Sequence, residues 1–299
     1  MSQNKVQIKK RNMRKIREAS SGYLFLLPAF TVFLTFMYYP MLKSIKMSFQ
    51  TFRNNQYEWA GLANYKTLFT NGDFLNSIII TVTYALVFVL LSICIAVVIS
   101  LTIEASFSKF QPIFRAAFYL PGVVPGVVMA LIWRWFYDPN AGLFNYILSL
   151  FGISEQMWLG DPDLALFSLI FMQLCTNLGP FVLIILAGLT SIQRDILESA
   201  RIDGAGKLAE IIFIKLPQLK PTLLYLLIVQ TINAFQVFTP VYLMTNGGPN
   251  GATDTIAYLI YSTAFRSGNI GLASAQSIVL MIIISIIALV QVRVLTQKD

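Results

Sequence analysis

Amide and hydroxyl side chains interrupt the apolar segments of this chain at positions where they could bind a solute. Gln230, Asn233 and Gln236 recur every three residues, which places them near one stripe of a helix, with Phe235 and Phe238 beside them. Amides and aromatic rings suit a neutral polyhydroxylated ligand, whereas a phosphorylated one would favour a cation. The alternative is hydrogen bonding between helices, which is common for amides in membranes. The candidate solute-path residues are Gln173, Thr176, Asn177, Gln230, Asn233, Phe235 and Gln236, and Gln276 is a further amide of the same kind.

Residues for catalysis and metal binding are scarce. The chain has no histidine, the commonest metal ligand and proton shuttle. Cys94 and Cys175 fall inside apolar segments, which predicts small hydrophobic side chains and not a disulfide or a metal site. The fragment Gly204–Leu208 resembles a phosphate loop, but it lacks the preceding glycine, and Leu208 replaces the Ser or Thr that binds magnesium. We therefore expect no catalytic residue, no metal site and no cofactor on this chain.

The elements that must position the polar residues are membrane helices. Hydrophobic residues make up 56% of the chain, charged residues 12%, and the mean hydropathy is +0.67, whereas soluble proteins carry about 25% charged residues. A hydrocarbon layer about 30 Å thick needs roughly 20 apolar residues per helix. Runs of that kind predict an all-α integral membrane protein with six transmembrane helices, near residues 23–42, 75–103, 116–133, 164–190, 221–243 and 269–292.

The formal charge of +8 is distributed unevenly between the two sides of these spans. Seven Lys and Arg residues precede the first span, two lie between the second and third, five between the fourth and fifth, and two follow the sixth, which leaves six on the other side. Positive residues mark the cytoplasmic side, so we expect both termini to be cytoplasmic and the charge to reflect the membrane and its lipid, not nucleic acid. A cleaved secretory signal is the alternative for the N-terminus, but the apolar run is long and lacks a small-residue cleavage site.

The predicted spans divide the chain into four parts. Residues 1–22 form a basic cytoplasmic tail, residues 23–74 the first transmembrane helix and an outer loop, residues 75–292 the main transmembrane domain with a cytoplasmic loop at 191–220, and residues 293–299 a second cytoplasmic tail. The outer loop carries Tyr57, Trp59 and Tyr65, which would anchor at the membrane interface or contact an external partner.

Helix-breaking residues occur at depth in three predicted spans. Irregular backbone survives in a membrane only when it is buried in protein or lines a water-filled cavity, so a translocation path is one interpretation. Close packing of helices around glycine is the other. The residues are Pro121, Gly122, Pro125 and Gly126 in the third span, Gly179 and Pro180 in the fourth, and Pro240 in the fifth.

The loop at 191–220 predicts a short amphipathic basic helix, a turn and a second helix, whose polar face would fit a groove of a soluble partner. Glu198, Ala200, Gly204, Ile214 and Leu216–Pro217 stand at the spacing Glu-Ala-Ala, three residues, Gly, nine residues, Ile-x-Leu-Pro, with Ser199 in place of the first Ala. In this signature the chain resembles the membrane subunit of binding-protein-dependent ABC importers of the carbohydrate type. The stretch 245–249, followed by Ala252–Thr253 and Tyr258 to Phe265, is similar to the first of two nonidentical permeases in sugar and glycerol-phosphate importers.

The resemblance implies a type I ABC importer permease fold in the cell membrane of a prokaryote. It implies a heterodimer with a second homologous permease, two cytoplasmic ATPase subunits that hold ATP and Mg, and an extracytoplasmic solute-binding protein. In this scheme Gly204 permits the turn, Pro217 ends the second short helix and Glu198 pairs with a basic residue of the ATPase. The residues expected to couple to the ATPase are Glu198, Ser199, Ala200, Asp203, Gly204, Ala205, Leu216 and Pro217.

The source of energy can also be inferred from the residues. The predicted span cores contain no ionisable residue, with Glu104 and Arg134 at span ends, and ion-coupled carriers usually place such groups inside the bilayer. The absence of such groups argues against a secondary transporter. Together with the resemblance to carbohydrate-type ABC importers, it predicts a permease that imports a sugar, specifically an oligosaccharide, and that is not itself an enzyme. The alternatives are import of glycerol phosphate or another small polar solute by the same architecture, and a membrane scaffold or sensor that docks a cytoplasmic protein.

Overall fold

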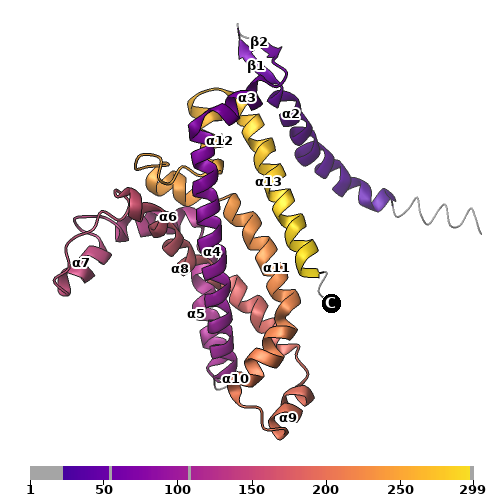
Figure 1. Ribbon diagram of the computed structural model, residues 1–299, viewed down its shortest axis with the longest axis vertical. Helices are drawn as coiled ribbons and strands as arrows, with labels where there is room; N and C mark the ends of the chain where they lie inside the picture. Colours follow the sequence, from indigo (N-terminus) through magenta and orange to yellow (C-terminus); the bar gives the residue numbers. More distant parts are fainter. Residues whose placement is uncertain (1–22, 54–55, 107–108, 297–299) are drawn as a thin grey trace, which may run out of the picture.

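The computed structural model describes residues 23–53, 56–106 and 109–296, and these are mostly helical (Figure 1). Within them, five helices are long and apolar enough to cross a membrane: Tyr23–Ser48, Gly72–Ala105, Pro162–Thr190, Lys207–Phe235 and Ile270–Val294. A bent pair, Gln111–Val123 and Gly126–Phe136, makes a sixth if it is counted as one span. The all-helical membrane fold is confirmed, while the tails predicted at 1–22 and 297–299 lie outside the described residues.

The elements run in the following order along the chain. The helices are α2 (Tyr39–Ser48), α3 (Ala63–Thr70), α4 (Gly72–Ala105), α5 (Gln111–Val123), α6 (Gly126–Phe136), α7 (Leu143–Leu150), α8 (Pro162–Thr190), α9 (Arg194–Ile202), α10 (Lys207–Glu210), α11 (Leu216–Phe235), α12 (Ile256–Tyr261) and α13 (Ile270–Thr296). The strands β1 (Gln50–Arg53) and β2 (Gln56–Trp59) pair antiparallel, and π-helical turns occupy Leu34–Tyr38, Ile211–Lys215, Val241–Thr245 and Ser262–Arg266.

The long helices stand side by side and separate two polar ends (Figure 1). The end drawn at the bottom carries α9 and α10, and the end drawn at the top carries β1, β2, α3 and α12. The helix Tyr23–Ser48 leans away from the others and meets them only through α2, which packs on α13. Its apolar window has no buried residue, so this helix presents its side chains to the surroundings along most of its length.

Local signals explain where the two longest spans begin. The side chain of Asn71 accepts a hydrogen bond of 2.9 Å from the Asp73 amide at the start of α4, and Asp161 accepts one of 2.9 Å from the Asp163 amide at the start of α8. Capping side chains satisfy amides that have no partner inside the helix, and acidic residues in the first turn oppose the helix dipole. Pro162 at the first helical position of α8 needs no amide donor there.

Small and hydroxyl-bearing residues line the buried face of α4. Ser77, Thr81, Ser92, Ala96 and Ser100 are all fully buried, and they recur at helical spacing along the side that faces α8 and α11. The Ser100 hydroxyl lies 2.7 Å from the Ala96 carbonyl and 3.2 Å from the Val182 carbonyl of α8. Because lipid is as apolar as leucine, membrane helices associate through close packing and such hydrogen bonds.

Gly179 allows the closest approach between α8 and α5. A Cβ atom at Gly179 would lie 2.4 Å from the Phe118 carbonyl oxygen and 2.7 Å from the Tyr119 Cα. Both contacts are with backbone, which cannot move aside as a flexible side chain would. At this glycine, close helix packing is therefore the correct one of the two interpretations that the sequence left open.

The third predicted span, at 116–133, is not a straight helix. The chain turns by 93° between α5 and α6, where Val124 and Pro125 are extended. Pro125 has no amide to continue the helix and disfavours helical geometry at the residue before it. The run of apolar residues does not reveal this bend, because the helices on both sides of it are apolar.

The fifth span lies further toward the N-terminus than the predicted 221–243. It begins at Lys207, passes through the π-helical turn Ile211–Lys215, and ends at Phe235. Pro217 lies in the first turn of α11, where the preceding π-helical turn accommodates the missing donor. The expectation that Pro217 ends a second short helix is therefore wrong.

The loop predicted at 43–74 begins only after Ser48, where the first helix ends, and it has structure of its own. It contains the hairpin β1–β2, in which Gln50 faces Trp59. Tyr65 donates or accepts a 2.8 Å hydrogen bond with buried Ser48, and Phe49 stacks on the ring of Trp59 at 5.6 Å. Tyr65 thus holds the loop together, whereas Trp59 remains 70% exposed and available for a contact.

The loop between Thr245 and Ile256 holds a carboxyl group in an unfavourable place. Asp254 has a buried Oδ1 atom without a hydrogen-bond partner. Burial, with a smaller contribution from the nearby charge of Asp73, raises the pKa of Asp254 from 3.8 to about 6. The folded protein therefore favours the protonated form, and the stability that this group contributes is complete below about pH 4 and is lost as the pH rises through about 6.

Replacing Gly179 with Ala should destabilise the contact between α5 and α8, since overpacking a tight contact costs about 1–3 kcal/mol. We expect a lower melting temperature of the purified protein in detergent. Gly72→Ala is the matched control, because open space surrounds the position of its Cβ. Equal melting temperatures for the two variants would contradict the packing argument.

Asp254→Asn should stabilise the protein at pH 7.5 and not at pH 4, because the charged form that costs free energy is removed only at the higher pH. The expected rise at pH 7.5 is roughly 2–4 °C, the shift that about 1 kcal/mol produces in a large domain. Melting curves at several pH values measure it. Equal effects of Asp254→Asn at pH 4 and at pH 7.5 would contradict this assignment.

Candidate functional site

The loop between α8 and α11 presents α9 at the end of the molecule. Gln193 is extended, α9 runs from Arg194 to Ile202, and the chain reverses at Gly204, whose φ of +87° strains any other residue type. The Ala205 amide donates 2.9 Å to the Ala200 carbonyl and the Gly204 amide donates 3.1 Å to the Arg201 carbonyl. These bonds close the helix in the manner of a glycine C-cap, so the predicted role of Gly204 in the turn matches its conformation.

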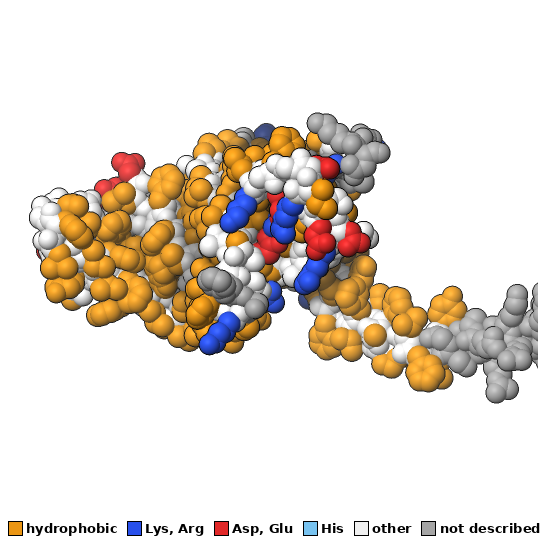
Figure 2. Space-filling model, turned by 90° about the horizontal axis from the view of Figure 1, so that it is seen from below, with side chains coloured by type: hydrophobic (Ala, Val, Ile, Leu, Met, Phe, Trp, Pro, Cys, Tyr) orange, Lys and Arg blue, Asp and Glu red, His pale blue; other side chains and the backbone are white. Residues whose placement is uncertain are grey.

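The surface of α9 is open. None of its residues is buried, and Glu198, Ser199 and Asp203 are exposed. Ile202 is 86% exposed, an unusual position for a large apolar side chain at a polar end. Figure 2, which views this end, shows Lys, Arg, Asp and Glu side chains gathered on it, beside the apolar flank of the bundle. A charged helix with an exposed isoleucine is the kind of surface that a soluble protein can bind.

The remaining residues predicted for this loop lie closer to the bundle. Ala200 and Ala205 are half-buried, Leu216 is half-buried in the first turn of α11, and Pro217 is exposed beside it. The structure thus brings Glu198, Ser199, Asp203 and Gly204 together on one exposed helix and turn. Leu216 and Pro217 belong to the membrane helix that follows, and they do not form part of that surface.

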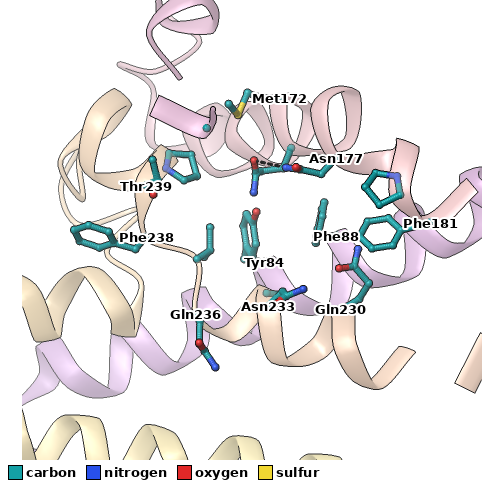
Figure 3. Close-up of a pocket in the computed structure, with 16 residues that line it drawn as sticks. Tyr84, Phe88, Met172, Asn177, Phe181, Gln230, Asn233, Gln236, Phe238 and Thr239 are labelled. Carbon is teal, nitrogen blue, oxygen red and sulfur yellow. Dashed lines mark hydrogen bonds between the residues drawn. The ribbon is translucent and has the colours of Figure 1, made fainter. Parts of the chain in front are cut away.

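A second site is a cavity of about 350 Å³ inside the bundle, within the range of small-molecule pockets (Figure 3). Tyr84 and Phe88 come from α4, Gln173 and Asn177 from α8, and the other walls from α11 and the segment after it. The first part of that segment, 236–238, is not helical, and Gly126 at the bend between α5 and α6 also lines the cavity. Two breaks in the membrane helices therefore meet at this cavity, as expected where irregular backbone lies at membrane depth.

The lining is polar but carries no charge. Asn177 donates a 2.9 Å hydrogen bond to Gln173 Oε1, and Gln230 Nε2 lies 3.5 Å from Ser92 Oγ. The Tyr84 hydroxyl, which lies among the labelled side chains of Figure 3, has no hydrogen-bond partner among the described residues. None of the residues that line the cavity is Asp, Glu, Lys or Arg, so it offers hydrogen bonds and aromatic faces to a solute and no ion pair.

The structure unites most of the predicted solute-path residues and separates two of them. Gln173, Asn177, Gln230, Asn233 and Gln236 all line the cavity, although Gln236 lies beyond the end of α11 with its amide pointing away from the other labelled side chains (Figure 3).

Thr176 and Phe235 do not line the cavity. The Thr176 hydroxyl donates 2.9 Å to the Met172 carbonyl, and Phe235 packs in the hydrophobic core. Gln276 is also buried away from it, with an unpartnered Oε1.

Sequence reasoning found one aromatic residue of the cavity, since Phe238, which it placed beside the amides, lines the cavity, but it missed the others. Tyr84 and Phe88 are four residues apart on α4, and their rings stack at 5.7 Å. In the sequence they read as two apolar residues of an apolar span. Their spacing on one helical face was the available signal, but only the fold shows that this face turns toward the amides of α8 and α11. The other unexpected lining residues are Met172, Phe181 and Thr239.

The comparisons with known proteins define the class of the chain. Residues 96–298 match the family described as binding-protein-dependent transport system inner membrane component. The match covers more than half of the chain, so the protein belongs to this family of multi-pass membrane transport subunits.

Individual relatives are similar over nearly their whole length. The trehalose/maltose transport system permease protein MalF of Thermococcus litoralis is 35% identical over 283 residues, which cover 94% of this chain and 95% of the relative. A chain in the crystal structure of a bacterial ABC transporter involved in the import of the acidic polysaccharide alginate superposes with a TM-score of 0.88, at 26% identity, over 97% of this chain and 99% of that chain. The same kind of transporter in complex with a periplasmic protein that holds an alginate pentasaccharide gives a TM-score of 0.84, at 26% identity, over 93% of this chain and 94% of that chain.

Proposed function

We propose that this chain is a transmembrane permease subunit of an ATP-driven importer of a neutral sugar. The observation that carries the proposal is the uncharged cavity of amides and aromatic rings at the meeting point of two helix breaks. Sugars offer many hydroxyl groups to amides and apolar ring faces to aromatic side chains. The names of the trehalose/maltose relative and of the alginate transporter support a carbohydrate.

An oligosaccharide is the finer form of the proposal. The cavity belongs to one subunit, and a second homologous permease would enclose it from the open side and enlarge it. Import of glycerol phosphate by the same architecture is the alternative. An anionic solute would favour a Lys or Arg in the lining, and the cavity has none, so we favour the neutral sugar.

Energy would enter through α9. The helix is exposed, charged and closed by Gly204, which suits a groove on a cytoplasmic ATPase subunit that holds ATP and Mg. Two such ATPase subunits, the second permease and an extracytoplasmic solute-binding protein complete the assembly. In this proposal the α9 end faces the cytoplasm, both chain termini are on that side, and the membrane is the cell membrane of a prokaryote. The excess of Lys and Arg in the segments near α9 supports this orientation.

Reconstitution tests the proposal against its alternatives. The complete complex in vesicles, with the binding protein and a panel of neutral sugars and glycerol phosphate, should accumulate a sugar when ATP is supplied inside. A membrane scaffold would accumulate none of them. A carrier driven by an ion gradient would keep working without ATP and stop with an ionophore. The ligand retained by the purified binding protein identifies the sugar to use first.

Asn233→Ala should raise the KM for uptake about fivefold, since the loss of one hydrogen bond costs about 1 kcal/mol. The yield of assembled complex should stay the same, because Asn233 is exposed to the cavity and makes no hydrogen bond within the described part of the chain. Asn177→Ala should act in the same direction. Gln218→Ala, which removes an exposed amide from the same helix far from the cavity, is the control. Unchanged uptake kinetics in both asparagine variants would remove them from the solute path.

Gly204→Asp should abolish uptake and loosen the ATPase subunits while leaving membrane insertion intact. A non-glycine residue at a φ of +87° costs about 1–3 kcal/mol, which the loop recovers by changing the direction of α9. Gly206→Asp adds the same charge two residues away, at an extended position that accepts Asp as a helix N-cap. Copurification of the ATPase and uptake are measured for both, and equal behaviour of the two variants would argue against the turn.

A further inference from the structure

A chain of four alternating charges runs from α9 into the bundle. The Arg201 guanidinium of α9 bonds both carboxylate oxygens of Glu210, at 3.0 and 3.2 Å. Glu210 Oε1 lies 3.1 Å from the ammonium of Lys215, and Lys215 Nζ lies 2.6 and 2.8 Å from the two carboxylate oxygens of Glu104 at the end of α4. The chain is electrically neutral and joins residues 111 positions apart in the sequence.

The inner part of this chain is buried. The side chains of Glu210 and Lys215 are only 7% and 10% exposed, and Glu104 is 26% exposed, whereas Arg201 is 60% exposed. A buried charge that loses its partner is strongly destabilising, while replacing a whole pair by neutral groups is often tolerated. Lys215 has two carboxylates and no alternative partner among the described residues, so its position fixes α4 and α10 relative to each other.

The chain of charges is the firmest link between α9 and the bundle that the described residues show. No residue of α9 is buried, and its apolar contact with the core is through half-buried Leu197. Hydrogen-bonded ion pairs keep their geometry only within a narrow range of distances and angles. A displacement of α9 is therefore passed to the bundle, and a displacement of the bundle to α9, until a pair breaks.

The two helices that meet at Lys215 and Glu104 both reach the cavity. Tyr84 lies about 20 residues before Glu104 on α4, and Gln230 and Asn233 lie about 15–18 residues after Lys215, distances of about 30 Å and 25 Å along the helices. A shift of the row of charges therefore moves the ends of α4 and α11 that lie near α9. The same two helices carry walls of the cavity further along their length.

We propose that Glu104, Glu210 and Lys215 are positioning residues that transmit the movement of α9 to α4 and α11, and so link ATP hydrolysis to opening and closing of the cavity. This inference rests on the proposed function. Conformational coupling needs an element with two discrete arrangements, and the formed and broken states of Lys215–Glu104 supply them. Glu104 is the last member of the row of charges, so its removal leaves the pairs Lys215–Glu210 and Glu210–Arg201 intact.

The test uses the whole complex in vesicles with the binding protein. Glu104→Gln should lower the sugar imported per ATP hydrolysed by roughly tenfold, within the range for residues that carry coupling. Lys109→Gln is the matched control, because Lys109 is a charge at the same end with no interaction among the described residues. Normal sugar transport per ATP in Glu104→Gln would overturn the proposal.

The double variant Glu104→Gln with Lys215→Met separates coupling from stability. In Glu104→Gln the buried Lys215 keeps only one of its two carboxylates, and removing its charge as well relieves that loss, so the melting temperature should recover toward the wild type. If the pair only stabilises the fold, sugar import per ATP recovers as well, and the proposal is wrong. If the pair couples, import per ATP stays low in a stable protein.

A distance measurement tests the link without any transport. Spin labels at Ser199→Cys on α9 and Thr102→Cys on α4, with Cys94 and Cys175 replaced by Ser, report how rigidly the two helices are joined. All four positions are exposed. We expect a narrow distance distribution in the wild type and a broad one in Glu104→Gln. Identical distributions would contradict the link, and absence of ATP-driven uptake in the wild type would instead contradict the proposed function.

Discussion

Water is absent from the hydrocarbon layer of a membrane, so each backbone amide and carbonyl of a span must find its partner inside the protein. The long helices α4, α8, α11 and α13 satisfy that requirement within themselves. Helical geometry is interrupted at the bend before Gly126 and at the non-helical residues 236–238, and Gly126 and 236–238 line the cavity. The position of the cavity thus follows from where the helices are allowed to break.

Many polar side chains of the spans also find partners inside the protein, although the Tyr84 hydroxyl and Gln276 Oε1 have none among the described residues. Hydroxyls of α4 and α8 return to carbonyls of their own helices, and the amides Gln173 and Asn177 bond each other at the cavity wall. Charge is confined to the ends of the helices, where Glu104, Lys215, Glu210 and Arg201 neutralise one another. The interior is therefore suited to a neutral solute, and the end that carries α9 is suited to a charged partner.

The two sites differ in how far sequence reasoning could reach them. The turn at Gly204 follows from local chemistry, because a glycine after a short helix predicts a left-handed C-cap and the structure has one. The amides of α8 and α11 were also identifiable, since amides are rare in apolar spans. Thr176 and Phe235 were predicted for the solute path but do not line the cavity, because periodicity gives the face of a helix and not the element that this face meets. The fifth span was misplaced because an uncharged run was taken to mark it, whereas the helix begins at Lys207 and includes Lys215 and Lys220.

The sequence by itself determined the membrane class and the approximate positions of five spans, while the predicted fifth span was displaced along the chain. It also determined the break points at proline and glycine and the loop that carries α9. Each of these depends on residues near one another in the chain, through hydrophobic periodicity, helix capping and the conformational limits of proline and glycine. Only the tertiary structure decided that Tyr84 of α4 faces the amides of α8 and α11, that Gly179 receives the backbone of α5, and that Lys215 meets Glu104. Those contacts join residues far apart in sequence, and they depend on the direction in which one helix packs on another, which no local pattern encodes.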